Sequence, residues 1–575
     1  MSSGEERLKA FVNNRWLVFV VSIWSQCCAG IGYLFGSISP VIKSAMGYNQ
    51  RQIAMLVVAK DLGDSVGSIA GALSEIVPFW AILAIGVLQN LFGHGLVWLI
   101  VTKRLAPLPL WVLCIAMFVG TNGETYFNTT ALVACAQNFP KGRGPIVNGF
   151  SGLSGAILTQ IYRMISSSVH GSLILMIAVG PSAVVICLMS TVRLVEGHRQ
   201  VRPSDGLSFT FIYCVCLILA AYLMIVLLLE DEIDFSESVI ITCSAILFVI
   251  LLLPLIIPII LAFFAAPPPP NAENFLIEPR ALESSKSKRD EPEVLLSEVD
   301  SEVESEDERM REGGRGKRIA HLQAKLFQAA AEGAVRVKRR RGPRRGENFI
   351  LRQALVKADF WLMFISLVIA AGSGVTIIDN LGQMSQSLGY EAGTFVSMIS
   401  IWNFLGRVGG GYFSEAVVRN YAYPRPVAMA VFQAIMAIGL LYYATGWPGA
   451  MYVVTLLNGL GYGAHWAIVP ASISELFGLK SFGALFSFLT LALAIGSLLF
   501  SGVMASNIYE YYAAKQADLR QPIQGGVPTT CTGTICYSIT CAILSGLLLV
   551  AIALTLLVVH RTRSVYAQLY AKPQT

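Results

Sequence analysis

The sequence predicts an all-α protein that crosses a bilayer about fourteen times. Of its 575 residues, 55% are apolar and only 14% are charged, whereas soluble proteins carry roughly 25% charged residues. The apolar residues gather in successive runs that reach the length one helix needs to span the hydrocarbon core. Peptide groups in lipid must find their hydrogen bonds within the segment, so these runs favour helices.

The apolar runs form two sets, with one long polar region at 267–350 between them. The spans expected before this region are 16–42, 52–75, 79–101, 108–136, 145–168, 172–192, 207–229 and 238–265. Those expected after it are 359–384, 391–414, 425–445, 449–471, 481–506 and 533–559.

A short echo links the two sets. Gly71–Glu75 and Gly411–Glu415 share a Gly-x-x-Ser-Glu pattern, and each closes an apolar run. Two halves built on one plan are typical of transporters with parallel repeats. The expected organisation is therefore two halves with two extra helices between them. By residue, it is 1–15 N-terminus, 16–192 first bundle, 193–266 extra helices, 267–350 charged and largely disordered linker, 351–560 second bundle and 561–575 tail.

Basic residues in the short connections predict the orientation. An even number of spans places both termini on one side, and Lys and Arg are about twice as frequent on that side, which the positive-inside rule assigns to the cytosol. The host is the plasma membrane or a vacuolar or other endomembrane. Cys531 and Cys536 lie near a polar loop on the opposite side, where a disulfide is one possibility.

Arg407 is the first candidate functional residue. It lies within the expected span 391–414 and keeps its charge at every physiological pH. A charge at membrane depth faces a bundle interior or a watery cavity, and a fixed cation suits a carboxylate. Asn403 precedes it by one helical turn and is expected to steady the guanidinium. A structural pair between Arg407 and a carboxylate such as Asp379 or Glu124 is the alternative.

Span 52–75 carries Lys60, Asp61 and Asp64 near its middle. Lys60 and Asp64 are four residues apart, so they share a helix face and are expected to pair. A proton-coupling site, in which a carboxylate takes up a proton, is one interpretation. A structural ion pair that braces the bundle is the other, and both stay open.

Span 108–136 has a polar middle that contains Asn122, Glu124 and Tyr126. Such a helix is expected to line water or a ligand, with Gly123 loosening it and Glu124 near the bilayer centre. In the second set, Asp379 polarises one span, and Asn458, His465 and Trp466 polarise another. A patch of small residues at Ser151–Gly155 is expected to permit close helix contact.

Several of these strings resemble the plant nodulin-like, or nuclear-fusion-defective, family of the major facilitator superfamily. The resemblance rests on Asn14–Trp16, Gly120–Thr129, Gln137–Pro140, Gly152–Ile157 and Asn348–Trp361. It implies two six-helix bundles that rock about a central cavity. More distantly, the chain is similar to oxalate–formate antiporters and monocarboxylate transporters. In the latter, Asp or Asn precedes a carboxylate-binding Arg, as Asn403 precedes Arg407 here.

The sequence therefore predicts a secondary active transporter that moves a small solute by alternating access and is coupled to protons. An organic anion, specifically a carboxylate, is the first choice of substrate. Arg407, Asn403, Glu124, Asn122, Tyr126, Asn458, His465 and Trp466 are the expected substrate-binding residues. Asp61, Asp64, Lys60, Glu124 and Asp379 are the expected proton-coupling residues.

Two alternatives stay open. One is a transporter of a neutral or cationic solute such as an amino acid, a sugar or a metal ion. The other is a receptor or scaffold that acts through 267–350. No nucleotide-binding loop, metal-ligand cluster or paired nucleophile and base is visible. We therefore expect a monomer that is not an enzyme, binds no cofactor or nucleic acid, and interacts with lipid, its solute and protons.

Overall fold

The computed structural model describes residues 3–74, 76–139, 146–165, 172–195, 205–233, 235–264, 346–478, 481–519 and 530–570. All regular elements in these ranges are helices, as the sequence predicts. Eight helical segments among them are long and apolar enough to cross a bilayer, so the chain is an integral multi-pass membrane protein. The count of fourteen spans stays a prediction. The expected linker lies outside the described residues except for 346–350.

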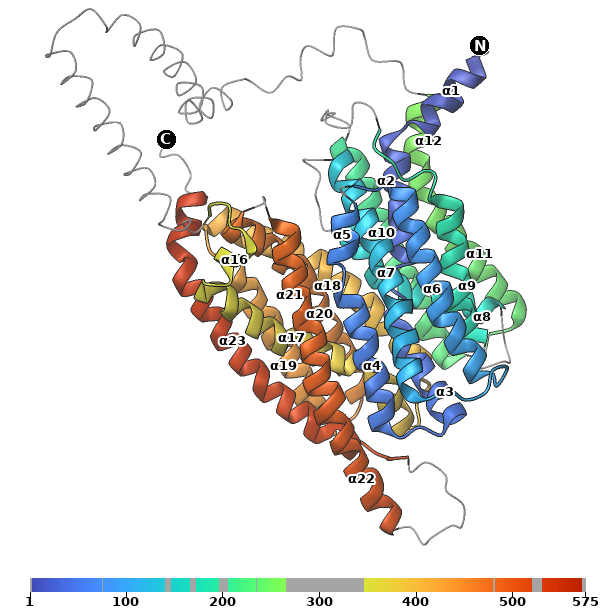
Figure 1. Ribbon diagram of the computed structural model, residues 1–575, viewed down its shortest axis with the longest axis vertical. Helices are drawn as coiled ribbons and strands as arrows, with labels where there is room; N and C mark the ends of the chain where they lie inside the picture. The colour runs from blue at the N-terminus through green and yellow to red at the C-terminus, as the bar shows by residue number, and fades with distance from the viewer. Residues whose placement is uncertain are drawn as a thin grey trace, which may run out of the picture. The chain divides into compact units, whose positions relative to one another are not determined.

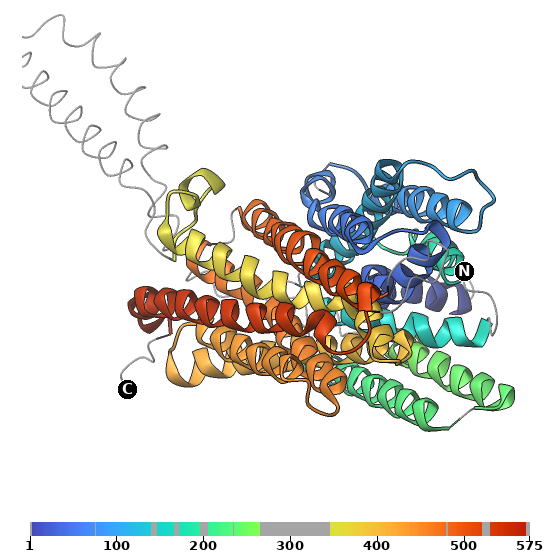
Figure 2. The ribbon, with the colours of Figure 1, turned by 90° about the horizontal axis from the view of Figure 1, so that it is seen from below.

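The described residues belong to one compact unit and form two halves. The first half comprises α1 (Ser3–Val12), α2 (Arg15–Cys27), η1 (Ile31–Leu34), α3 (Phe35–Met46), α4 (Gln50–Ser65), α5 (Ser68–Leu73), α6 (Phe79–Val101), α7 (Leu110–Asn138), α8 (Ile146–Ile165), α9 (Ser172–Leu188), α10 (Asp205–Glu232), α11 (Glu237–Leu252), η2 (Leu253–Leu255) and α12 (Ile256–Phe263). The second half comprises α16 (Leu351–Ala354), α17 (Ala358–Ser387), α18 (Ala392–Tyr421), α19 (Pro426–Ala444), α20 (Ala450–Phe477), α21 (Phe482–Gly496), the π-helix η5 (Ser497–Ala505), α22 (Ser506–Leu519) and α23 (Ile535–Leu569). Figures 1 and 2 both show the blue-to-green helices of the first half side by side with the yellow-to-red helices of the second.

The first expected span, 16–42, lies within a segment, Arg15–Met46, that is long and apolar enough to cross a bilayer, but its helix is interrupted. Helix α2 ends at Cys27, and the 3₁₀ turn η1 leads into α3. Two glycines, Gly30 and Gly32, lie at the break and weaken a helix there. The backbone N–H of Gly32 donates to the carboxylate of Glu124 at 3.1 Å. A carboxylate at this position stabilises the start of a helix because N–H groups there have no partner within it.

The second expected span, 52–75, is also interrupted. Helix α4 starts with a capping box in which Asn49 and Gln52 exchange hydrogen bonds, and it ends at Ser65. The side chain of Asn122 donates to the carbonyl oxygens of Gly63 and Val66 at 3.0 and 2.9 Å. These bonds satisfy carbonyls near the end of α4.

Helix α7 runs without interruption through Gly123, so the expected loosening is wrong. A Cβ atom at Gly123 would lie 2.5 Å from the carbonyl oxygen of Gly86 on α6. The glycine therefore permits close packing of α6 on α7 and does not bend the helix.

The two halves meet tightly at one end of the bundle. A Cβ atom at Gly382 on α17 would lie only 1.9 Å from the carbonyl oxygen of Gly36 on α3. Gln383 donates to Ser39 at 3.0 Å, and Gln50, at the start of α4, donates to Asn380 at 3.1 Å. We call these residues (Gly36, Ser39, Gln50, Asn380, Gly382 and Gln383) the closed layer.

The disulfide between Cys531 and Cys536 lies near the closed layer. The backbone N–H of Cys531 donates to the hydroxyl of Tyr509 at 3.2 Å, and the Tyr509 ring packs on Tyr537. The Tyr537 hydroxyl donates to Asn380, a closed-layer residue, at 3.2 Å.

The predicted small-residue patch makes the expected close contact. A Cβ atom at Gly155 would lie 2.3 Å from the hydroxyl of Ser400, and one at Gly152 would lie 3.0 Å from the backbone nitrogen of Phe404. Helix α8 of the first half therefore crosses α18 of the second half just before Arg407.

The extra helix α10 is joined to the first half by a buried ion pair. Both Asp205 oxygens accept from Arg15, at 2.6 and 2.7 Å, and the Arg15 guanidinium lies over the Phe139 ring. Trp16 and Phe209 pack on the same ring. Two strings that carry the family resemblance, Asn14–Trp16 and Gln137–Pro140, thus contribute to one contact with α10.

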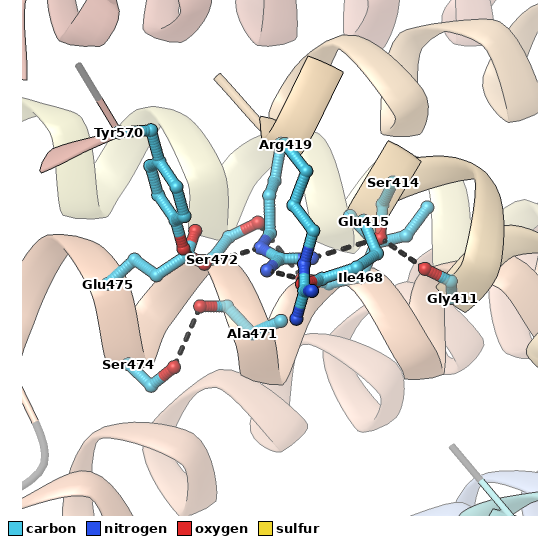
Figure 3. A network of polar contacts seen from close by, with 11 residues as sticks. Gly411, Ser414, Glu415, Arg419, Ile468, Ala471, Ser472, Ser474, Glu475 and Tyr570 are labelled. Carbon is cyan, nitrogen blue, oxygen red and sulfur yellow. Dashed lines mark hydrogen bonds and ion pairs between the residues drawn. The ribbon is translucent and has the colours of Figure 1, made fainter. Parts of the chain in front are cut away.

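A polar network lies at the opposite end from the closed layer, where α18, α19, α20 and α23 meet (Figure 3). Arg425 pairs with Glu415 and, at 2.6 Å, with Glu475. The Tyr570 hydroxyl donates to Glu475 at 2.7 Å. Burial and the Glu475 carboxylate raise the pKa of Tyr570 to about 12, so this phenol stays protonated. Glu415 belongs to the repeated Gly411–Glu415 string, and the network supplies its basic partner from the start of α19.

Candidate functional site

A cavity of about 130 Å³ lies between the two halves. Helices α4 and α7 and the break before η1 line it from the first half, and α17, α18, α20 and α21 line it from the second. The polar and charged lining residues are Tyr33, Lys60, Asp61, Asp64, Ser65, Thr121, Glu124, Asn128, Arg407, Tyr462, Trp466 and Thr490. Such a group of charges between two halves is a candidate solute site.

Arg407 reaches the cavity from the middle of α18. Its Nε donates to the side-chain oxygen of Asn403 at 3.0 Å, as the one-turn spacing predicts. Its Nη2 donates to the hydroxyl of Tyr33 at 2.9 Å, in the other half. The carboxylates offered as structural partners are engaged elsewhere, since Asp379 pairs with Lys60 and Glu124 binds the backbone of Gly32.

Lys60 connects two carboxylates from different halves. Its ammonium group lies 2.7 Å from Asp61 and 2.8 Å from Asp379. The expected pair with Asp64 is wrong, because Asp379 approaches from α17 and competes for the ammonium. The second oxygen of each paired carboxylate, Oδ2, is buried and accepts no hydrogen bond. Two buried carboxylates therefore share one cation, an arrangement that is unfavourable unless further charge compensation is available.

One face of α7 lines the cavity, as its polar middle predicts. Thr121, Glu124 and Asn128 follow one another at spacings of three and four residues and point to the same side. Glu124 is 2% exposed. Its Oε2 accepts from Gly32, and its Oε1 is buried without a hydrogen-bond partner.

Asp64 differs from the other carboxylates because its side chain is exposed to solvent within the cavity. It lines the same cavity as Arg407 and Glu124, so the wall carries both cationic and anionic groups.

Several predicted site residues lie outside the cavity wall. Asn122 caps α4, and Tyr126 packs within a hydrophobic cluster of the first half. Asn458 donates to the carbonyl of Gly374 at 3.1 Å, and His465 Nδ1 bonds its own helix at Gly461. Asn403 and Asp379 stand behind Arg407 and Lys60 and hold them in place.

The predicted site did not include six polar residues of the wall, namely Tyr33, Ser65, Thr121, Asn128, Tyr462 and Thr490. Tyr462 belongs to the same helix as Trp466 and packs against it, and Thr490 belongs to α21, whose sequence is mostly apolar. Tyr33 follows the helix break. The break could have been suspected from the Gly30 and Gly32 pair, whereas nothing in the sequence marks Thr490.

The lining residues lie on the side of the closed layer that faces the chain termini. Helix α4 begins in the closed layer at Gln50 and reaches the cavity only at Lys60. Helix α17 passes the cavity at Val375 and reaches the closed layer at Asn380. In Figure 1 the labelled α1 and the end of α23 lie toward the end opposite α3 and α22.

Two family models match the chain, one in each half. A model described as Nodulin-like matches residues 15–259, and a model described as the NFD4 C-terminal domain matches residues 346–568. Both halves of the chain are thus covered by related family descriptions.

Individual relatives agree with the family models. Protein NUCLEAR FUSION DEFECTIVE 4 of Arabidopsis thaliana is 23% identical over 566 residues, which cover 96% of this chain and 90% of that protein. Probable transporter MCH1 of Yarrowia lipolytica is 26% identical over 206 residues, which cover 34% of this chain and 40% of the fungal protein. A solved structure from work on proton dependent oligopeptide transporters is 12% identical over 97% of this chain and all of that chain, with a TM-score of 0.49.

Proposed function

The chain belongs to the nodulin-like family of the major facilitator superfamily, and we propose that it carries a small organic anion by proton-coupled alternating access. The observation that carries the proposal is the position of Arg407. It is a permanent cation within the bilayer, on the wall of a cavity between two halves.

Arg407 is suited to hold a carboxylate. Its guanidinium is oriented by Asn403 from its own helix and by Tyr33 from the other half. A charge-assisted hydrogen bond to such a group contributes about 1.5–3 kcal/mol. Because Tyr33 and Arg407 come from different halves, a solute that binds at this point contacts both halves at once.

Lys60 is suited to couple the two halves to protons. It bridges Asp61 in the first half and Asp379 in the second, and both carboxylates keep a buried oxygen without a donor. Protonation of either carboxylate removes its negative charge and so weakens the bridge to Lys60. The halves then separate more easily at the adjacent closed layer.

We assign the closed layer to the extracytosolic side. The Cys531–Cys536 disulfide lies on this side, and disulfides persist in oxidising compartments. Both termini are then cytosolic, in agreement with the distribution of basic residues. In this state the cavity lies on the cytosolic side of the closed layer.

The test is uptake of labelled carboxylates into proteoliposomes, with and without a pH gradient. The wild type is compared with Arg407→Gln and with Arg419→Gln, an exposed arginine on the same helix. We expect Arg407→Gln to lower carboxylate uptake tenfold or more and Arg419→Gln to leave it within twofold. Transport of carboxylates that is unaffected by Arg407→Gln would refute the assigned role of Arg407.

A second candidate substrate class is a neutral or cationic solute. The observation in its favour is the number of carboxylates on the wall, namely Asp61, Asp64 and Glu124. In that case Arg407→Gln has little effect on uptake of the solute, while Glu124→Gln abolishes it.

A further inference from the structure

The cavity wall carries more carboxylates than its two basic residues, Arg407 and Lys60, can neutralise. Asp61 is paired with Lys60, but Glu124 and Asp64 have no ion pair with a basic residue among the described residues. Glu124 Oε1 is buried without a hydrogen-bond donor. A buried carboxylate oxygen in this state is costly, so it favours a ligand that brings a donor.

The break before η1 places this acceptor close to the cation. Consecutive residues bind the two charged groups, since the N–H of Gly32 donates to Glu124 and the hydroxyl of Tyr33 accepts from Arg407. Asp64 lines the same cavity as Arg407 and Glu124. One small molecule can therefore reach a guanidinium and two carboxylates at once.

We propose that the transported carboxylate also carries an ammonium group, so that the substrate class is a zwitterion such as a 2-amino acid. Its carboxylate binds Arg407, and its ammonium group binds Glu124 Oε1 and Asp64. The inference rests on the proposed function, because it assumes that Arg407 holds a carboxylate. It adds recognition of the substrate's ammonium group to the recognition of its carboxylate by Arg407.

An ammonium group fits the acceptors better than a metal ion does. A metal ion such as Mg²⁺ or Ca²⁺ takes six or more oxygen ligands, and the described residues contain no group of three or more His, Cys, Asp or Glu placed to hold one. An ammonium group has three donors and can use two carboxylates and one further acceptor. A sodium ion is the alternative occupant of the ammonium position, and the experiment below distinguishes the two by comparing sodium and potassium buffers.

The cavity wall has an aromatic part that can contact the side chain of the substrate. Tyr462 and Trp466 line the cavity from α20. A substrate series should therefore include an aromatic member and a small one.

The experiment uses two matched sets of labelled solutes and the full-length protein in proteoliposomes. The sets are alanine, lactate and ethylamine, and phenylalanine, phenyllactate and phenethylamine. Within each set the ammonium or the carboxylate is removed while the rest is kept. Each solute is measured in sodium and in potassium buffer, with wild type and with Glu124→Gln, which is nearly isosteric.

We expect the amino acid of at least one set to enter at least tenfold faster than its hydroxy acid and its amine, in both buffers. Glu124→Gln should lower the ratio of amino acid uptake to hydroxy acid uptake at least tenfold, to about one. A wild type that moves the hydroxy acid as fast as the amino acid overturns the inference but keeps the proposed function. The inference is also overturned if Glu124→Gln lowers uptake of the amino acid and the hydroxy acid equally, or if amino acid uptake strictly requires sodium. If no carboxylate in either set is taken up, both the inference and the proposed function are refuted.

Discussion

At the scale of single residues, the arrangement of charge decides the mechanism we propose. Lys60 holds carboxylates from both halves, so a change in either carboxylate alters the contact between the halves. Arg407 donates to Asn403 and to Tyr33, and these bonds orient its guanidinium on the cavity wall, where a solute can meet it.

Asp379→Asn tests the coupling role of the Lys60 bridge. Asn resembles a protonated Asp in shape and charge, so this variant should no longer respond to protons at this position. We expect solute accumulation driven by a pH gradient to fall at least tenfold, while exchange of solute between the two sides continues. Asp379→Glu, which keeps the charge, is the matched control and should retain accumulation in part. Accumulation by Asp379→Asn at the wild-type level would exclude the bridge from coupling.

Residues of the site differ in how well sequence predicts them. A charge within an apolar run is visible in the sequence, so Arg407, Lys60, Asp61, Asp64 and Glu124 could be selected. Their partners were harder to predict. Lys60 pairs with Asp379, about 320 residues away, and not with Asp64 on its own helix, because tertiary contacts between halves override a local spacing rule.

At the scale of helices, close backbone contact joins the two halves at the closed layer. Gly382→Ala should disturb it, because a Cβ there would overlap the Gly36 carbonyl oxygen at 1.9 Å. Overpacking of this kind costs about 1–3 kcal/mol. In a protein that carries Gly382→Ala, we expect a cysteine introduced at Ser39 to react faster with an impermeant thiol reagent added on the extracytosolic side than the same cysteine does without Gly382→Ala. Gly409→Ala, where a Cβ would meet no atom within 4 Å, is the control, and equal reaction rates in both variants would argue against a tight closed layer.

The ion pair of Arg15 and Asp205 should be essential for stable docking of α10. Both side chains are buried, at 7% and 12% exposure, and removal of one partner of a buried pair costs about 3–5 kcal/mol. We expect Asp205→Asn to lower the unfolding temperature of the purified protein in detergent. The double variant with Arg15→Asp and Asp205→Arg should recover part of the loss, and an unfolding temperature unchanged in Asp205→Asn would show that other contacts hold α10.

Helix interiors were easier to predict than helix breaks. Long apolar runs mark α17 and α23 directly. The breaks in 16–42 and 52–75 depend on side chains of α7, because Glu124 binds Gly32 and Asn122 binds Gly63 and Val66. Such partners are brought together only by the fold, so the ends of the helices at these breaks could not be predicted from the sequence.

At the scale of the whole molecule, the features have one consistent interpretation. The closed layer and the disulfide lie at one end, the polar network of Arg425 lies at the other, and the charged cavity lies between them. The composition was sufficient to predict a membrane protein, and the repeated strings predicted two halves. The closed layer could not be predicted, because it consists of contacts between segments more than 300 residues apart, such as Gln383 with Ser39.

The central claim is that Arg407 stands in a passage that opens alternately to each side. The most direct measurement is the reaction of a cysteine at Thr490, on the cavity wall, with an impermeant thiol reagent added to either face of sealed proteoliposomes. We predict that the cysteine reacts from the cytosolic face at rest, and that it also reacts from the extracytosolic face once solute and a proton gradient are supplied. A cysteine that never reacts from the extracytosolic face, while solute flux continues, would contradict the account.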